Sequence, residues 1–257
     1  MILWTKWHAI TLIPAFVVMV IAALLLRKFL KNKEEKVQMI PIKIIAIILV
    51  VLEIAKQIYS IVKGYNLYHI PLHFCSLFIY LFPLFAFYNG KHKDFVRSFT
   101  ITCGAMLFVF MAIYPELIVG GSDISKCFVE FLPTHATVFH YLALFAFVLM
   151  VVFKFYTPDA KRDFKTLFIG FGVYSLIAGS MANILKVNFN NFYDCSIAPL
   201  RSLQVAVVEK MGWAGQLIYV VVVAILIYLF AMLCYGLYRG FYAICSAIKK
   251  KINKTES

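Results

Sequence analysis

Long apolar stretches alternate with short polar breaks along almost the whole chain. Seven apolar windows follow one another, and each matches the roughly 17 to 25 residues that a helix needs to cross a ~30 Å hydrocarbon layer. The windows cover residues 9–26, 40–62, 70–88, 98–119, 133–153, 166–185 and 213–235. The pattern predicts an all-α polytopic membrane protein, in which residues 1–257 form a single domain with seven transmembrane helices.

Composition supports this class. Hydrophobic residues make up 63% of the chain, charged residues only 14%, and the mean hydropathy is +0.87. A soluble domain of 257 residues is rarely so apolar. The first window has its basic flank after the apolar stretch, which is the reverse of a secretory signal peptide, so we expect it to remain as a span.

The net charge of +13 reflects topology more than any nucleic-acid partner. Most of the lysines and arginines lie in 27–43, 89–97, 154–165 and a basic tail at 236–257. Because cytoplasmic loops carry the excess of Lys and Arg, this distribution predicts the amino terminus outside and the carboxyl terminus in the cytoplasm. Phospholipids are therefore the expected partners of the basic residues, and nucleic acid is not.

One longer break, residues 186–212, contains turn-like and helical sequence. The run Asn188–Asp194 favours turns, and residues 199–211 are typical of a short helix that ends at Gly212. No soluble domain is expected there.

Polar side chains from six predicted spans share one depth. The positive-inside topology places them in the outer half of the membrane, where such groups are tolerated mainly if they line a cavity, pair or perform chemistry. We therefore predict a polar cavity between the helices. Trp213 and Gln216 represent the last span at this depth, and the candidate site residues from the other five are Cys75, His73, His140, His135, Lys56, Glu116 and Asn183.

A thiol and an imidazole together favour nucleophilic chemistry, because histidine can take the proton from the thiol. His73 lies two positions from Cys75, and residues two apart in a helix point in nearly opposite directions. His140, at a similar predicted depth, is therefore the better candidate for the base. His73 would bind the substrate or stabilise an oxyanion.

Ordinary explanations exist for each residue. A membrane cysteine is most often a small packing residue, and a lone histidine often bonds between helices. Glu53 and Lys56 are spaced to form an ion pair on one helix face. Asn183 could bond across helices, and Glu116 could mark a helix end. Only the shared depth favours a site.

Cofactor motifs are missing from the sequence. It contains no CxxC, HExxH or GxGxxG spacing, so neither a metal nor a diffusible cofactor is expected. Cys127 and Cys195 lie in the two larger outer loops, where an oxidising compartment would permit a disulfide.

A family resemblance rests on three short motifs. The run Pro71-Leu72-His73-Phe74-Cys75-Ser76, then Phe139-His140, and Asn183 followed by Asn188-Phe189 resemble the bacterial YwaF-like integral membrane proteins. That family is similar to the eukaryotic transmembrane protein 164 acyltransferases. The resemblance implies a seven-helix fold and acyl transfer through a cysteine thioester, with Cys75 as the nucleophile and His73 and His140 as the motif histidines.

Together these observations predict a phospholipid acyltransferase or acyl hydrolase in a bacterial plasma membrane. Cys75, His140 and His73 would be catalytic, while Asn183, Lys56, Glu116 and His135 would bind the substrate. The alternative is a small-molecule transporter, or the substrate-binding membrane subunit of one, that uses the same outward cavity. A purely scaffolding or sensory membrane protein is a third possibility.

Overall fold

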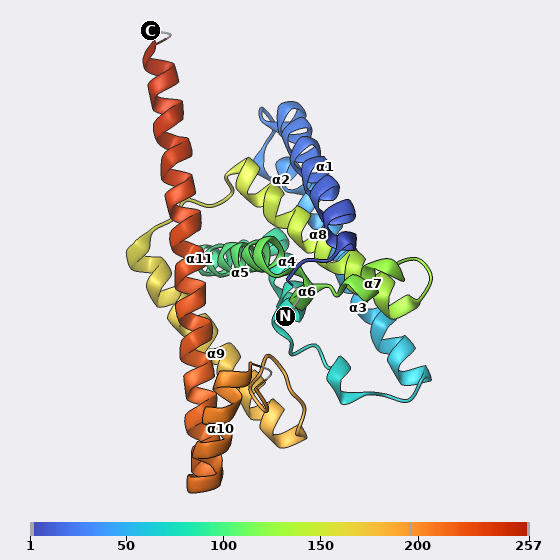
Figure 1. Cartoon of the computed structure of the whole chain (residues 1–257). Coiled ribbons are helices and arrows are strands. Elements are labelled where there is room, and N and C mark those ends of the chain that lie inside the picture. Colours follow the sequence, from blue (N-terminus) through green and yellow to red (C-terminus); the bar gives the residue numbers. More distant parts are fainter. Residues whose placement is uncertain (1–2, 196, 256–257) are drawn as a thin grey trace.

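The described part of the chain is built from helices. The structure, a computed structural model, describes residues 3–195 and 197–255, apart from the side chains of 198, 199, 249, 250 and 252–255. Within these ranges no strand occurs (Figure 1). The elements are α1 Lys6–Leu30, α2 Glu35–Gln38, α3 Ile40–Val62, η1 Leu67–His69, η2 Phe74–Leu77, α4 Phe78–Phe87, α5 Lys93–Ile113, α6 Pro115–Ile118, α7 Gly121–Ser125, α8 Phe131–Phe153, α9 Ala160–Leu185, α10 Ala198–Met211 and α11 Trp213–Thr255. The all-α class is confirmed.

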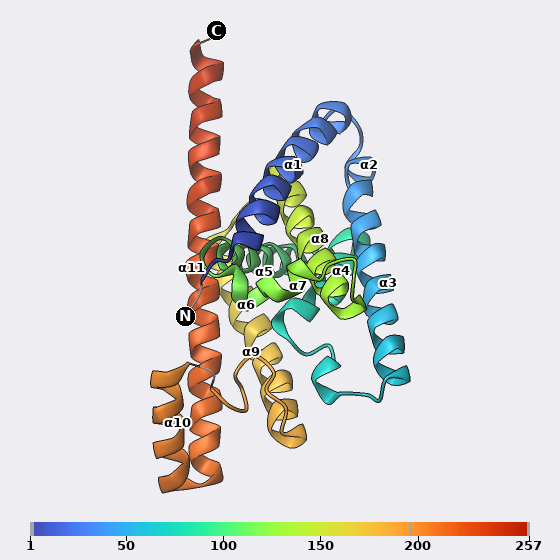
Figure 2. The same cartoon turned by 45° about the vertical axis from the view of Figure 1, so that its right-hand side comes forward.

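Six of the described helices are long and apolar enough to cross a membrane, namely α1, α3, α5, α8, α9 and α11. The chain is therefore a multi-pass membrane protein. Helices α5 and α8 form its centre, since 61% and 56% of their apolar windows are buried, against 11% for α1. In both cartoon views α5 runs across the long axis of α11 instead of along it (Figures 1 and 2).

The third predicted window, residues 70–88, is not a full-length helix. Regular α-helix covers only Phe78–Phe87, preceded by the short 3₁₀ turn η2. Proline disfavours helical backbone in the residue before it, and Ile70 before Pro71 has ψ of 132°. His73 is also extended, with ψ of 152°. The 14 residues from Phe74 to Phe87 are shorter than a complete span, so a seventh crossing is not confirmed.

Two other predicted boundaries differ from the structure. The window 98–119 begins earlier, at Lys93, and breaks at Tyr114, beyond which Pro115 starts the separate turn α6. Helix α11 continues past the predicted end at Tyr235 to Thr255, so most of the basic tail is helical. Residues 256–257 of that tail lie outside the described residues.

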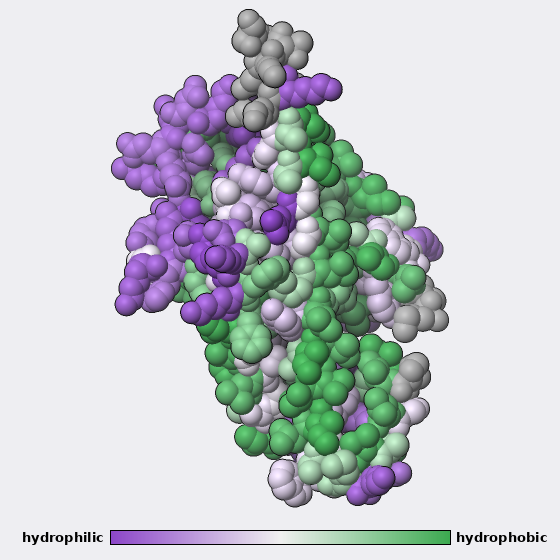
Figure 3. Space-filling view, turned by 90° about the vertical axis from the view of Figure 1, so that its left-hand side faces the viewer, coloured by the Kyte–Doolittle hydropathy of each residue, from purple (hydrophilic) through white to green (hydrophobic). Residues whose placement is uncertain are grey.

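The basic loops gather at one end of the molecule. Glu35 pairs with Lys93 at 3.2 Å and with Arg97, which joins the α2 segment to α5. Arg162 of α9 pairs with Asp94 of α5 at 2.7 Å. Figure 3 shows hydrophilic side chains concentrated towards one end, with a largely hydrophobic surface over the rest of that face. This grouping agrees with the prediction that the basic loops lie on one side of the membrane, whereas the side that this end faces stays a prediction.

Helix α10 runs lengthwise beside the first part of α11 (Figures 1 and 2). The predicted short helix over 199–211 is thus confirmed, and Gly212, with φ of +59°, ends it as expected. The two helices approach closely at Gly215, where a Cβ atom would lie 2.4 Å from the carbonyl oxygen of Val207. Any larger residue at 215 would push the two helices apart.

Candidate functional site

A cavity of about 850 Å³ lies between the helices on the side away from the basic loops. Most of its wall comes from α3, the 67–76 segment, α5, α8, the 188–191 loop and α11. Five of the seven predicted site residues line it, namely Cys75, His73, His140, His135 and Lys56. The prediction that hydrophilic groups from different spans meet in one cavity therefore agrees with the structure for these five.

Cys75 lies in the first turn of the η2–α4 helix. Its side chain is partly exposed and its thiol is free. The preceding extended residue, His73, begins this turn, so the cavity wall at this point is made of irregular backbone. Irregular backbone at membrane depth is tolerated where it is buried in protein or lines a cavity. The break in the third window thus presents Cys75 to the cavity.

Asn190 holds the backbone on both sides of His73. Its Oδ1 accepts a hydrogen bond from the Phe74 N–H at 2.8 Å, and its Nδ2 donates to the Leu72 carbonyl at 3.1 Å. The hydroxyl of Tyr174, on α9, donates to the same carbonyl at 3.1 Å. Asn190 has φ of 52°, a left-handed conformation that asparagine adopts more readily than most residues. The 188–191 loop therefore fixes the position of the Cys75 turn.

His140 has one engaged and one unengaged ring nitrogen. Nδ1 lies 2.6 Å from the carbonyl oxygen of Ala136. Because a carbonyl only accepts, Nδ1 carries a proton, and in the neutral ring Nε2 then has a lone pair. Nε2 is buried and has no hydrogen-bond partner among the described residues. His140 and Cys75 thus share a cavity, with no hydrogen bond between them.

His73 has the opposite arrangement. Its Nε2 lies 3.1 Å from the carbonyl oxygen of Tyr68, so Nε2 carries the proton and Nδ1 is the acceptor in the neutral ring. The imidazole packs between the rings of Tyr68 and Phe189, at centroid distances of 4.3 and 5.2 Å. The Nε2–H group, which an oxyanion would need as a donor, is thus already bonded to the Tyr68 carbonyl. This contact ties His73 to the η1 segment.

Lys56 and Glu53 form the predicted ion pair, with Nζ and Oε1 2.8 Å apart. Nε2 of Gln57 donates to the same carboxylate oxygen at 2.7 Å, and it also donates to the His69 carbonyl oxygen at 2.7 Å. Nε2 of His135 lies 3.9 Å from the second carboxylate oxygen and has no hydrogen-bond partner among the described residues. Lys56 is therefore a neutralised cation at the cavity wall.

His69 belongs to the same polar group. Its Nδ1 is 2.6 Å from the hydroxyl of Ser60 on α3. Burial lowers the pKa of His69, as does the nearby ammonium of Lys56, while Glu53 raises it. The imidazole is thus neutral at physiological pH. The hydrogen bonds from Ser60 and Gln57 fasten the η1 segment to α3, and so position the loop that carries His73.

Two predicted substrate residues do not line the cavity. Glu116 accepts a hydrogen bond from the Gly121 N–H at 2.9 Å and lies 3.8 Å from Nε2 of His8. Asn183 donates to the Phe192 carbonyl at 3.2 Å and accepts from Gln216 at 2.8 Å. Glu116 therefore stabilises the α6–α7 turn, and Asn183 anchors the loop that carries Asn190. Both have the ordinary structural roles that remained open in the sequence.

The disulfide between Cys127 and Cys195 does not form, and both are free thiols. Cys195 is buried, and its Sγ lies 3.6 Å from the carbonyl oxygen of Ile197. Cys127 lies instead in the turn after α7, which packs on α8 and α1. Among the described residues, no group of three His, Cys, Asp or Glu side chains could hold a metal ion.

Three residues that shape the site were not predicted from the sequence, namely Asn190, Tyr174 and Gln57. Asn190 lies in the run whose first members, Asn188 and Phe189, were singled out, but its contact with Phe74 spans 116 residues. Periodicity carries no signal for such a contact. Gln57 was the easiest of the three to predict. It lies four residues after Glu53, and residues four apart on a helix are neighbours.

Comparison with known proteins identifies one family. The comparisons with curated proteins and with solved structures found no match. A model of the TMEM164 family, in contrast, matches residues 3–235, which include every described cavity residue and all of the predicted spans. The match covers far more than half of the chain. It agrees with the resemblance that the motifs around Cys75, His140 and Asn183 indicate. The chain belongs to the TMEM164 family.

Proposed function

We propose that the protein transfers fatty acyl groups from membrane phospholipids through a thioester on Cys75. The observation that carries the proposal is the shared cavity of Cys75 and His140, in which His140 presents a buried, unpartnered Nε2. A thiol beside a histidine base is the usual arrangement for covalent acyl transfer. Membership of the TMEM164 family and the resemblance to acyltransferases support the same chemistry.

His140 is the proposed general base. The Ala136 carbonyl holds the proton on Nδ1, so Nε2 is free to take the thiol proton. Cys75 sulfur then attacks the acyl ester carbonyl, and a C–S bond forms. Collapse of the tetrahedral intermediate breaks the ester C–O bond, and the lysolipid alcohol leaves with the proton from His140. The thioester next passes to a second alcohol or to water, for which His140 acts as base again.

His73 is better suited to positioning than to oxyanion stabilisation. Its Nε2–H is used by the Tyr68 carbonyl, and neutral Nδ1 can only accept. The backbone N–H groups in the first turn of a helix have no intrahelical partners, and Cys75 is the second residue of η2. We therefore assign oxyanion stabilisation to the N–H of Cys75, with His73 holding the turn in place.

The cavity wall suits a lipid. Apolar side chains of α5, α8 and α11, among them Met106, Phe110, Leu132 and Phe230, occupy much of it, while Asn188 and the Lys56–Glu53 ion pair are its polar groups. Such a lining accommodates an acyl chain beside a few groups that orient the ester. His135, next to Glu53, is assigned to the head-group side. A plasma-membrane location, which the sequence favours, places the lipid substrate within reach of this cavity.

The transporter alternative has less support. It relied on Lys56, Glu116 and the histidines as substrate ligands, but Lys56 is paired with Glu53 at 2.8 Å. Glu116 is absent from the cavity wall and is bound by Gly121. Transport would also give no role to the free thiol of Cys75 in the same cavity.

The test is acyl exchange in liposomes that contain the purified protein, an isotope-labelled phosphatidylcholine and a lysophospholipid acceptor. Cys75→Ala should abolish exchange, because the thioester cannot form. Cys103→Ala is the matched control: Cys103 is a buried cysteine on α5 that does not line the cavity. Exchange at the wild-type rate in Cys75→Ala, with correct insertion, would contradict the proposal.

A further inference from the structure

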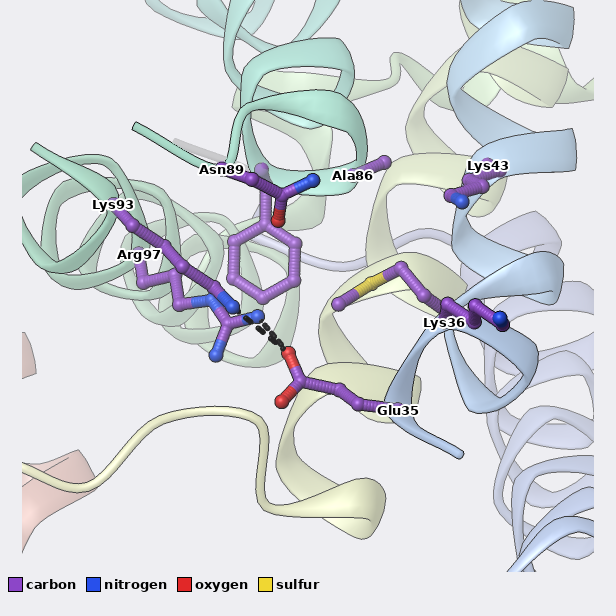
Figure 4. Close-up of a pocket in the computed structure, with 9 residues that line it drawn as sticks. Glu35, Lys36, Lys43, Ala86, Asn89, Lys93 and Arg97 are labelled. Atoms are coloured by element: carbon purple, nitrogen blue, oxygen red, sulfur yellow. Dashed lines mark hydrogen bonds and ion pairs between the residues drawn. The ribbon is translucent and has the colours of Figure 1, made fainter. Parts of the chain in front are cut away.

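A second pocket lies at the basic end, far from Cys75 along the helices. It encloses about 200 Å³ and is lined by Glu35, Lys36, Met39, Lys43, Phe85, Ala86, Asn89, Lys93 and Arg97, which we call the basic pocket (Figure 4). This volume is several times the ~30 Å³ that a water molecule takes up in the liquid. There is thus room for a tetrahedral anion.

The charge of the basic pocket is unbalanced. Four cationic residues line it beside a single carboxylate, that of Glu35. Glu35 uses one oxygen, Oε1, for both Lys93 and Arg97. Lys43 has no acidic partner among the described residues, and its Nζ lies 5.5 Å from the centre of the Phe87 ring. An anion in the pocket would therefore meet cations that Glu35 does not neutralise.

The guanidinium of Arg97 is incompletely hydrogen-bonded. Its side chain is only 11% exposed, and its Nε is buried without a hydrogen-bond partner among the described residues. One terminal nitrogen donates to the Phe155 carbonyl at 3.0 Å and the other to Glu35. Removing a guanidinium nitrogen from water without a partner is costly. A ligand oxygen that accepted a hydrogen bond from Nε would offset this desolvation cost.

The location indicates the class of ligand. The basic pocket lies where α3 begins, where α4 ends and where α5 begins, so it is at the boundary between apolar spans and polar loops. Phospholipid phosphates occupy this level of a membrane. Met39, Phe85 and Ala86 are buried apolar residues beside the cations, and they suit the carbon atoms next to a phosphate. Arginine and lysine are the usual protein contacts of phosphate groups.

We propose that the basic pocket binds the phosphoryl group of an anionic membrane lipid. Lys43, Lys93 and Arg97 contact the phosphate oxygens, and the Asn89 amide, which Figure 4 shows above the same space, donates a further hydrogen bond. Glu35 is a built-in competitor, because its carboxylate occupies Lys93 and Arg97 when no lipid is bound. Being 54% exposed, it is free to swing aside.

The test measures lipid binding to the detergent-purified full chain by native mass spectrometry, with dioctanoyl-phosphatidylglycerol as the probe. Lys43→Ala should weaken binding about fivefold, the effect of one basic residue near a membrane surface. Glu35→Gln should tighten it, since the competitor is lost. Lys33→Ala is the matched control, because Lys33 is an exposed lysine in the turn between α1 and α2, at the same basic end, that does not line the pocket.

Added probes separate the ligand chemistries. Dioctanoylglycerol, which lacks the phosphate, should not compete, whereas inorganic phosphate at high concentration should. Equal losses in Lys43→Ala and Lys33→Ala would overturn the proposal, since they would mean binding by general surface charge. So would binding that responds to Lys56→Ala and not to Lys43→Ala, because the lipid would then lie in the Cys75 cavity. Inorganic phosphate that binds as tightly as the lipid would overturn the lipid assignment.

Discussion

Asn190 accepts a hydrogen bond from the backbone N–H of Phe74 at 2.8 Å, although 116 residues separate the two. Phe74 directly precedes Cys75, so this bond connects the loop after α9 to the turn that carries the thiol. The same amide donates to the Leu72 carbonyl. The geometry of the proposed nucleophile thus depends on a residue from a distant loop.

Asn190→Ala should therefore slow acyl exchange strongly while it lowers the free energy of unfolding only moderately. Loss of two hydrogen bonds costs about 1–3 kcal/mol of folding free energy, while a misplaced nucleophile costs on the order of 100-fold in rate. Asn190→Asp keeps the acceptor for Phe74 and should recover part of the rate. The measurements are exchange rate and thermal unfolding midpoint, with exposed Asn32→Ala as the control. Equal rates in Asn190→Ala and the wild type would contradict the positioning role.

His140→Asn tests the general base. Asparagine can still donate to the Ala136 carbonyl from Nδ2, but it has no counterpart of the Nε2 lone pair. Loss of general-base catalysis should reduce the exchange rate by about 10²–10⁴-fold. His92→Asn, which changes an exposed histidine at the opposite end, should leave the rate unchanged. A comparable rate in His140→Asn and the wild type would remove His140 from the mechanism.

Asp163 offers a test of the fold that is independent of the chemistry. This fully buried carboxylate at the start of α9 accepts from Tyr235 of α11 at 2.7 Å, from the Asp159 N–H at 2.8 Å, and also from Tyr156. Asp163→Ala leaves buried donors unpaired and should cost about 3–5 kcal/mol. Unfolding of the purified protein should shift accordingly, whereas Asp123→Ala, in the short α7 turn, should shift it little. Equal stability of the two variants would contradict this packing of α9 on α11.

Glu35 predicts a pH dependence at the basic end. Its hydrogen bond from Arg97, together with that from Lys93, lowers the pKa of Glu35 below the usual 4.5, despite opposing burial. A lowered folded-state pKa gives stability that is present above the unfolded pKa and is lost as pH falls through the folded one.

Because Glu35 is half exposed, the pairs are worth at most about 1 kcal/mol. Glu35→Gln should unfold at a lower temperature than the wild type near pH 7, and the two curves should meet below pH 4.5. Thermal unfolding measured across this range checks the expectation, with exposed Glu34→Gln as the control. A gap between the curves that widens as pH falls would contradict the assigned sign.

Hydropathy and charge spacing predicted much of the fold. Six apolar windows form long helices, and the loops with clustered lysines gather at one end. The alternation of strongly and weakly basic loops predicted one depth for Cys75, His140 and Lys56, and all three line one cavity. That prediction used the topology and the 1.5 Å rise per residue, and it needed no knowledge of which helices are neighbours.

The remaining features depend on contacts that one-dimensional patterns do not carry. The sequence predicted one continuous helix over 70–88, but the extended backbone at His73 is held by Asn190 from a distant loop. Glu116 was assigned to the cavity by depth, and depth does not specify the direction in which a side chain points. The helical tail beyond Tyr235 was obscured because its lysines end the apolar pattern without ending the helix.

If Cys75 carries the acyl group, intact-protein mass spectrometry after incubation with a phospholipid bearing a deuterated acyl chain should detect it. We expect a single adduct with the mass of that acyl chain, located at Cys75, removed by neutral hydroxylamine and formed far more slowly in His140→Asn. Acyl exchange by the protein with no adduct on Cys75, or with the adduct on another residue, would contradict this role of Cys75.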